Sequence, residues 1–334
     1  MARFPRDDPS TLGRGRAMAG AAAPSDSAEP SDSAEPSDSA EPSDSAGAGP
    51  ARAPRVSIVV PVHNEEENIG PCLDAALRQT TPADEIIVVD NASTDATRAR
   101  LAGYTDRVVL LTEPRLGVLA ARNRGLMAAT GDVIGRIDAD TRLPPYWVEG
   151  VRRVFADGTV AAVTGPVTYY DIRFPAVLNA VDRTLRRAWT LPSRQRLDWL
   201  FGANMAVRAR AWHAIRTDLC DDRRYHEDLD LGIHLRRAGH RVVFAAELRA
   251  GTSARRFRND PADFWAYLRM IDASYASHSG RAGSASYWRA WLTSRLIMLC
   301  YLPFRALHRA HPAYSAAPRK NPMAAEPSPP SRGS

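Results

Sequence analysis

The feature that most constrains this chain is a regular alternation of strand-like and helix-like patterns between residues 56 and 170. Short runs of β-branched and other apolar residues predict buried strands, and each is followed by a stretch with helical spacing of apolar side chains. The predicted strands are 56–62, 85–90, 107–113, 132–140 and 159–170, and the predicted helices are 64–80, 93–104, 117–130 and 144–157. Short connections between alternating elements predict an α/β fold with a mostly parallel, Rossmann-like sheet and helices on both faces.

Three aspartates stand where predicted strands end. Asp90 closes the second strand, and Asp138 and Asp140 close the fourth in the stretch IGRIDAD. Ligands of such sheets bind beyond the carboxyl ends of the strands, so these carboxylates should meet in one crevice. Neighbouring carboxylates repel each other unless a cation lies beside them, and their oxygens suit Mg²⁺ or Mn²⁺. A solvated turn remains the alternative, because Asp-x-Asp occurs again at residues 228–230.

A second acidic cluster opens the segment YHEDLDLGIHLRRAGHRV (225–242). Apolar side chains at helical spacing predict an amphipathic helix that ends near Gly239. Glu227 and Asp228 fall in its first turn, where the helix dipole favours ionised carboxylates. Asp228 could serve there as a general base, whereas ordinary first-turn acids are the alternative.

Charge and composition limit the classes of partner that the chain is expected to bind. The formal net charge is +6, although residues 24–46, which repeat PSDSAE, hold seven acidic side chains and no basic one. The positive remainder suits anionic partners such as phosphorylated small molecules or anionic lipid surfaces. The chain has no phosphate-loop or dinucleotide motif, and its basic residues are not interleaved with aromatics. We therefore expect no nucleic-acid partner.

Cysteine usage and the N-terminal residues favour a cytoplasmic protein. Cys72, Cys220 and Cys300 lie far apart, no pair has zinc-site spacing, and their odd number argues against a disulfide framework. The first residues lack the apolar core of a signal peptide. The expected organisation is a disordered arm (1–54), an α/β domain (55–250), a helical extension (251–314) and a disordered tail (315–334).

Five segments in order carry a family resemblance: VSIVVPVHNEEENI, EIIVVDNASTDAT, LGVLAARNRGLMAATGDVIGRIDADT, GANMAVRARAW and HEDLDLGIHLRRAGHRV. Together they closely resemble the family 2 glycosyltransferases, which have the GT-A fold, over residues 55–250. The resemblance implies inverting transfer of a sugar from a nucleotide-diphosphate-sugar donor to a hydroxyl of a carbohydrate or lipid-linked acceptor.

The resemblance also implies residue roles. Asp138 and Asp140 match the Asp-x-Asp that binds the ribose and the metal. Asp228 matches the catalytic base, and Glu227 would support the acceptor or the site. The remaining expected donor residues are Pro61, His63, Glu65 and Asp90, with Arg115 and Arg122 near the phosphates, and the expected acceptor residues are Gly202, Asn204, Arg255 and Arg256. For both arginine pairs, and for His226 and His240 as extra metal ligands, a plain surface role remains the alternative.

Departures from the family pattern refine the prediction. Processive members carry Q-x-x-R-W after the Glu-Asp helix, whereas this chain has TSARRFRN (252–259), which favours single additions. A nucleotidyltransferase would need a Gly-rich basic loop after the first strand, where the chain has acidic HNEE (63–66). A non-catalytic sugar-binding or scaffold protein predicts loss of Asp140 or Asp228, yet both are present.

The segment 284–311 combines apolar, aromatic and basic residues. Its apolar core LIMLCYLPF (296–304) is too short to span a bilayer. Two interpretations stay open: a helix lying in a membrane interface, which would place the protein peripherally on the inner face of the plasma membrane, or a helix packed on the catalytic domain.

Overall fold

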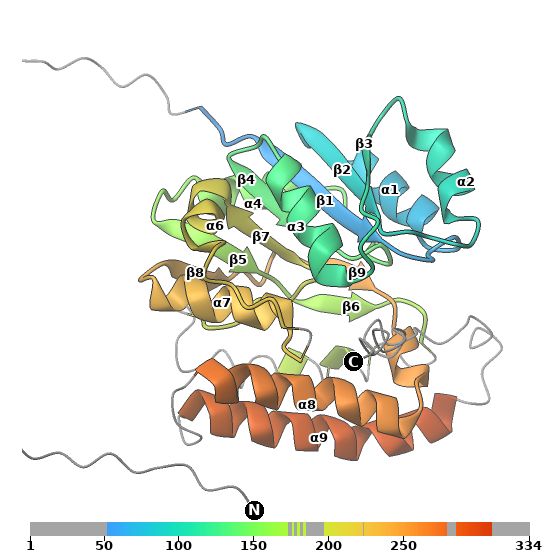
Figure 1. The fold of residues 1–334 in the computed structure, drawn as a ribbon, viewed down its shortest axis with the longest axis vertical. Helices are drawn as coiled ribbons and strands as arrows, with labels where there is room; N and C mark the ends of the chain where they lie inside the picture. The colour runs from blue at the N-terminus through green and yellow to red at the C-terminus, as the bar shows by residue number, and fades with distance from the viewer. Residues whose placement is uncertain are drawn as a thin grey trace, which may run out of the picture. The chain divides into compact units, whose positions relative to one another are not determined.

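The computed structural model of the chain (Figure 1) describes residues 52–172, 197–222, 224–278 and 285–308, together with residues 176, 179, 180, 183 and 184. The expected tail 315–334, and all of the expected arm except residues 52–54, lie outside the described residues.

The central sheet has the strand order β3-β2-β1-β4-β7-β5-β8. Its strands are β1 (Val56–Val62), β2 (Glu85–Asp90), β3 (Val109–Thr112), β4 (Val133–Arg136), β5 (Val160–Thr164), β7 (Met205–Arg208) and β8 (Arg241–Phe244). Only β7 runs antiparallel to its neighbours β4 and β5 among the strands described. The predicted mostly parallel sheet is therefore confirmed, with one antiparallel strand that the sequence patterns did not predict.

Helices cover both faces of this sheet, as predicted, because alternate strand residues point to opposite sides. One apolar core packs α1 (Ile69–Leu77), α2 (Thr97–Leu101) and α4 (Trp147–Phe155) on one face. The other packs α3 (Val118–Ala128), α6 (Ala209–Ile215) and α7 (Glu227–Arg237) on the opposite face. Figure 1 shows the long C-terminal helices α8 (Pro261–His278) and α9 (Ala285–His308) side by side.

The predicted strand 159–170 is two strands. It breaks at Gly165 and Pro166, after which β6 (Val167–Tyr169) leaves the main sheet and pairs with β9 (Ala250–Thr252). A Cβ on Gly165 would lie 1.8 Å from the carbonyl oxygen of Leu248, so this corner needs glycine. The expected domain boundary at residue 250 coincides with the start of β9.

The predicted helix 64–80 begins later than expected, at Ile69. Asn64 does not cap it: this residue has φ 52°, and its side-chain Oδ1 accepts the backbone N–H of Thr94 at 2.8 Å. The asparagine therefore fastens the loop after β1 to the loop after β2. The fourth strand also ends early, at Arg136, which leaves residues 137–140 as a loop at the carboxyl edge of the sheet.

Candidate active site

Asp90 lies at the end of β2 and is only 2% exposed. Its Oδ1 accepts the backbone N–H of Ser93 at 3.1 Å, and its Oδ2 accepts Nε of Arg98 at 2.6 Å. These contacts hold the carboxylate at the carboxyl edge of the sheet, where the sequence predicted it.

The loop after β1 lies against the loop after β2. Nδ1 of His63 is 2.6 Å from the carbonyl oxygen of Asn91, and the backbone N–H of Glu65 donates to Oγ1 of Thr97 at 2.8 Å. Pro61 lies on β1 opposite Val89 of β2. The two neighbouring loops therefore gather the residues that the resemblance assigns to the nucleotide pocket.

Asp140 is buried at 2% exposure beyond β4. Its Oδ2 lies 3.1 Å from Nε and 3.0 Å from Nη2 of Arg255, which comes from the 3₁₀ turn η2 (Arg255–Arg258). The same guanidinium pairs with the carboxylate of Glu65. Arg255, which the sequence predicts near the acceptor or the diphosphate, neutralises two of the predicted donor-site acids.

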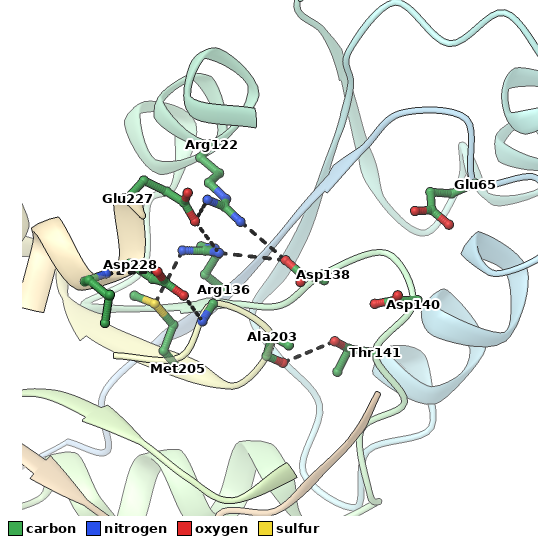
Figure 2. A network of polar contacts seen from close by, with 12 residues as sticks. Glu65, Arg122, Arg136, Asp138, Asp140, Thr141, Ala203, Met205, Glu227 and Asp228 are labelled. Atoms are coloured by element: carbon green, nitrogen blue, oxygen red, sulfur yellow. Dashed lines mark hydrogen bonds and ion pairs between the residues drawn. The ribbon is translucent and has the colours of Figure 1, made fainter. Parts of the chain in front are cut away.

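Two arginines bring the two acidic motifs together (Figure 2). Nη2 of Arg122 lies 3.5 Å, and Nη2 of Arg136 3.7 Å, from Oδ1 of Asp138. Both arginines also pair with the carboxylate of Glu227, Arg136 at 3.3 Å. The carboxyl end of β4 and the first turn of α7 thus share one pair of cations, although 89 residues separate Asp138 from Glu227 in the sequence.

Sequence reasoning missed Arg136. Its side chain is 2% exposed, and a buried guanidinium needs compensating partners. Nη1 also contacts Sδ of Met205 at 3.6 Å. The available signal was an arginine within the apolar run VIGRI, two residues before the Asp-x-Asp. Gly202 makes its position possible, because a Cβ there would lie 1.8 Å from Nη2 of Arg136.

Asp228 is half-buried in the first turn of α7. Its Oδ2 accepts the backbone N–H of Gly202 at 2.8 Å, and its Oδ1 accepts that of Leu229 at 2.9 Å. Gly202 therefore has two structural tasks: it leaves room for Arg136 and it orients the carboxylate of Asp228.

Asn204 lies deeper than an acceptor contact requires. It is fully buried, and its amide donates to the carbonyl oxygens of Pro166 at 3.0 Å and Leu248 at 2.7 Å. Its Oδ1 accepts Nε1 of Trp147 at 2.8 Å. These bonds use both amide hydrogens, so Asn204 shapes the wall of the site rather than offering donors to a sugar.

The remaining predicted residues differ in their surroundings. Arg115 is exposed and pairs with Glu113 at 3.3 Å, so it does not join the Asp138 group. The guanidinium of Arg256 lies 3.9 Å from the ring centroid of Tyr267. His226 is buried with Nε2 3.1 Å from the carbonyl oxygen of Tyr267, and burial lowers its pKa.

The donor set suits a hard divalent cation. Asp138, Asp140 and Glu65 offer carboxylate oxygens, which Mg²⁺ and Mn²⁺ prefer. Their negative charge acts on the buried thiol of Cys72, whose pKa is raised by burial and further by these three carboxylates. Arg255 supplies positive charge at two of the acids, Asp140 and Glu65.

Comparison with known proteins agrees with this geometry. The profile of glycosyl transferase family 2 matches residues 57–222. Glycosyltransferase AglE of Haloferax volcanii is 37% identical over 123 residues, which are 35% of this chain and 40% of the relative. The chain thus matches well under two thirds of that relative's length.

Solved structures show the same fold. A mannosyltransferase, PcManGT from Pyrobaculum calidifontis in complex with GDP-Man and Mn²⁺, superposes with a TM-score of 0.57 at 23% identity, over 80% of this chain and 77% of that one. S. aureus TarS 1–349 gives a TM-score of 0.53 at 15% identity, over 72% and 73% of the two chains. Residues 57–222 place the chain in glycosyl transferase family 2, on a GT-A fold.

Proposed function

We propose that this chain transfers a sugar, with inversion, from a nucleotide-diphosphate-sugar donor to a hydroxyl group of a carbohydrate or lipid-linked acceptor. The observation that carries the proposal is the shared arginine pair. Arg122 and Arg136 hold Asp138, at the donor end of β4, next to Glu227, which adjoins Asp228 on α7. A donor bound at Asp138 would therefore face a base at Asp228.

The reaction needs one proton acceptor. As the acceptor oxygen bonds to the anomeric carbon, Asp228 takes the hydroxyl proton. The bond from that carbon to the phosphate oxygen breaks, and its electron pair leaves with the nucleoside diphosphate. One displacement at the anomeric carbon inverts its configuration. The two backbone N–H groups that hold the carboxylate of Asp228 fix its orientation before the acceptor arrives.

Asp138 and Asp140 would hold Mg²⁺ or Mn²⁺. When bound, such an ion neutralises the charge that develops on the leaving diphosphate. The complex of PcManGT with Mn²⁺ supports this assignment, as does the all-oxygen donor set. Arg255 pairs with Asp140 and Glu65, so its guanidinium would compete with the ion for these carboxylates.

The exposed apolar residues of α9 form one stripe. The stripe consists of Trp288, Leu292, Leu296, Leu299 and Leu302. Spacings of three and four residues put these side chains on one helix face. No helix in the described ranges is both long and apolar enough to cross a bilayer. The stripe supports contact with a membrane surface and hence a lipid-linked acceptor. Cosedimentation of the full chain with anionic vesicles, with Leu299→Glu for comparison, tests this contact.

The donor site is tested by thermal unfolding of the full chain with a panel of nucleoside diphosphates, with and without Mn²⁺. A ligand that binds only the folded state raises the unfolding midpoint. We expect a rise that needs both Mn²⁺ and one nucleotide and that disappears in Asp140→Ala. No rise with any nucleotide would contradict the proposal. Determining the anomeric configuration of the product by NMR then tests inversion.

A further inference from the structure

Four side chains with nitrogen, sulfur and oxygen donors meet away from the donor pocket. Asp230 and His234 lie one turn apart on α7, His278 ends α8, and Cys220 lies in the segment before α7. Their ligand atoms all lie within 4.8 Å of one another. Asp230 and His278 are buried, and Cys220 and His234 are half-buried.

We call these four residues the Cys220 cluster. Their ligand atoms surround a small, roughly tetrahedral space. Nε2 of His234 and Nε2 of His278 are 3.1 Å apart. Sγ of Cys220 lies 3.5 Å from Nε2 of His278 and 4.0 Å from Nε2 of His234. Oδ1 of Asp230 lies 2.8 Å from Nε2 of His278 and 3.5 Å from Nε2 of His234.

These separations match those around a bound zinc ion. Zinc binds nitrogen and oxygen at about 2.0–2.1 Å and sulfur at about 2.3 Å, which places tetrahedral ligands about 3.3–3.6 Å apart. The observed values, from 2.8 to 4.0 Å, bracket that range. The distances depart from that range by at most about half an ångström.

Outer contacts orient two of the ligands. Nδ1 of His278 donates to the carbonyl oxygen of Ser274 at 2.6 Å, so Nε2 turns its lone pair toward the cluster. Oδ2 of Asp230 accepts the backbone N–H of Cys220 at 3.0 Å, which leaves Oδ1 facing the histidines. That oxygen is buried and makes no hydrogen bond of good geometry with any described residue, despite its closeness to His278.

We infer that the Cys220 cluster is a structural zinc site with four protein ligands. One thiolate and one carboxylate balance the charge of Zn²⁺, and two neutral imidazoles complete the set. A mixed nitrogen, sulfur and oxygen set favours zinc over Mg²⁺ or Mn²⁺, which prefer oxygen alone. Binding replaces the thiol proton of Cys220, which is released to solvent.

The site would join three segments of the chain. It ties the segment around Cys220 and the end of α8 to the first turns of α7, the helix that begins with Glu227 and Asp228. Zinc would therefore stabilise the position of the predicted base without touching the substrate. The inference does not depend on the proposed glycosyl transfer.

The direct test is the metal content of the full chain after purification without chelator, measured by inductively coupled plasma mass spectrometry. We expect about one zinc per chain, and its loss in Cys220→Ser and in His278→Gln. The matched control is Cys300→Ser, which changes an exposed cysteine of α9 and should keep the zinc. Zinc that persists in both cluster variants would overturn the inference, as would zinc-free wild-type protein that binds none on titration.

Cobalt substitution gives a second, spectroscopic readout. Co²⁺ added to chelator-treated wild-type protein should produce the intense visible absorption of a tetrahedral ion and a thiolate charge-transfer band in the near ultraviolet. Stoichiometric Zn²⁺ should abolish both signals, and Cys300→Ser should reproduce them. Weak octahedral absorption without a thiolate band would contradict a site that contains Cys220.

Discussion

Asp140 and Asp230 are both buried aspartates, but their neighbours differ in chemistry. Asp140 lies with Glu65 and the guanidinium of Arg255, so a carboxylate and a buried guanidinium surround it. Asp230 lies among two imidazoles and a thiol. The difference teaches that the neighbours of a carboxylate select the ion that it can hold. An oxygen set suits the Mg²⁺ or Mn²⁺ that we propose at the first aspartate, and a mixed set suits the zinc that we propose at the second. We assign catalysis to the first region and stability to the second.

The largest effect is expected for Asp228→Asn, which tests the assignment of catalysis to the first region. Loss of a general base lowers rates by roughly 10² to 10⁴-fold, so kcat should fall by at least about 100-fold. Steady-state transfer kinetics measure it. Asp263→Asn, the same change at an exposed aspartate in the first turn of α8, should leave kcat unaltered. A fall of less than about threefold in Asp228→Asn would assign the proton to another group.

Gly202→Ala tests the link between the two acidic motifs. Its Cβ would collide with the guanidinium of Arg136, and overpacking of this kind costs about 1–3 kcal/mol. We expect kcat to fall by about 10-fold as Arg136 and Asp228 move together. Gly158→Ala is the control, because a Cβ there meets nothing within 4 Å. Equal kinetics for the two variants would contradict the link.

Selective removal of zinc tests the distinction between the two sites. Stripping zinc from the Cys220 cluster should lower the unfolding midpoint by roughly 5 °C, given about 2–3 kcal/mol for a saturating ligand. Adding Mn²⁺ back should not restore the midpoint, whereas Zn²⁺ should. Differential scanning calorimetry on the full chain distinguishes the two ions. If Mn²⁺ restored the unfolding midpoint as fully as Zn²⁺, the result would contradict the chemical distinction between the two sites.

The smallest expected effect belongs to Arg255→Gln. Its guanidinium competes with a divalent ion for Asp140 and Glu65, so its loss should tighten Mn²⁺ binding by about 3- to 10-fold. Isothermal titration without nucleotide measures this. Arg249→Gln, at an exposed site, is the matched control. Weaker Mn²⁺ binding in Arg255→Gln would show that the arginine supports the ion instead of replacing it.

The parallel half of the fold was predictable from the sequence because its strands are continuous apolar runs. The predicted ranges 56–62 and 85–90 coincide with β1 and β2. Asp90, Asp138 and Asp140 follow such runs, so their place at the carboxyl edge followed as well. The antiparallel β7 was missed, because MAVR is too short to show a period and its pairing with β4 depends on distant residues.

Long-range contacts explain what the sequence could not reveal about the sites. The fit of Gly202 against Arg136 joins residues 66 positions apart, and no local pattern encodes it. In the Cys220 cluster, Asp230 and His234 have readable helical spacing, whereas His278 joins them only because α8 packs against α7. Spacing rules for cysteine pairs could not detect a site that uses one cysteine.

The most direct test of the central claim is equilibrium binding of the nucleotide identified in the thermal panel, with Mn²⁺, to Asp140→Asn and Asp228→Asn. We predict that Asp140→Asn loses metal-dependent binding and transfer together. Asp228→Asn should bind within about threefold of the wild-type affinity and lose transfer, because a general base adds little to ground-state binding. Retained metal-dependent binding in Asp140→Asn, or lost binding in Asp228→Asn, would contradict the separation of donor site and base.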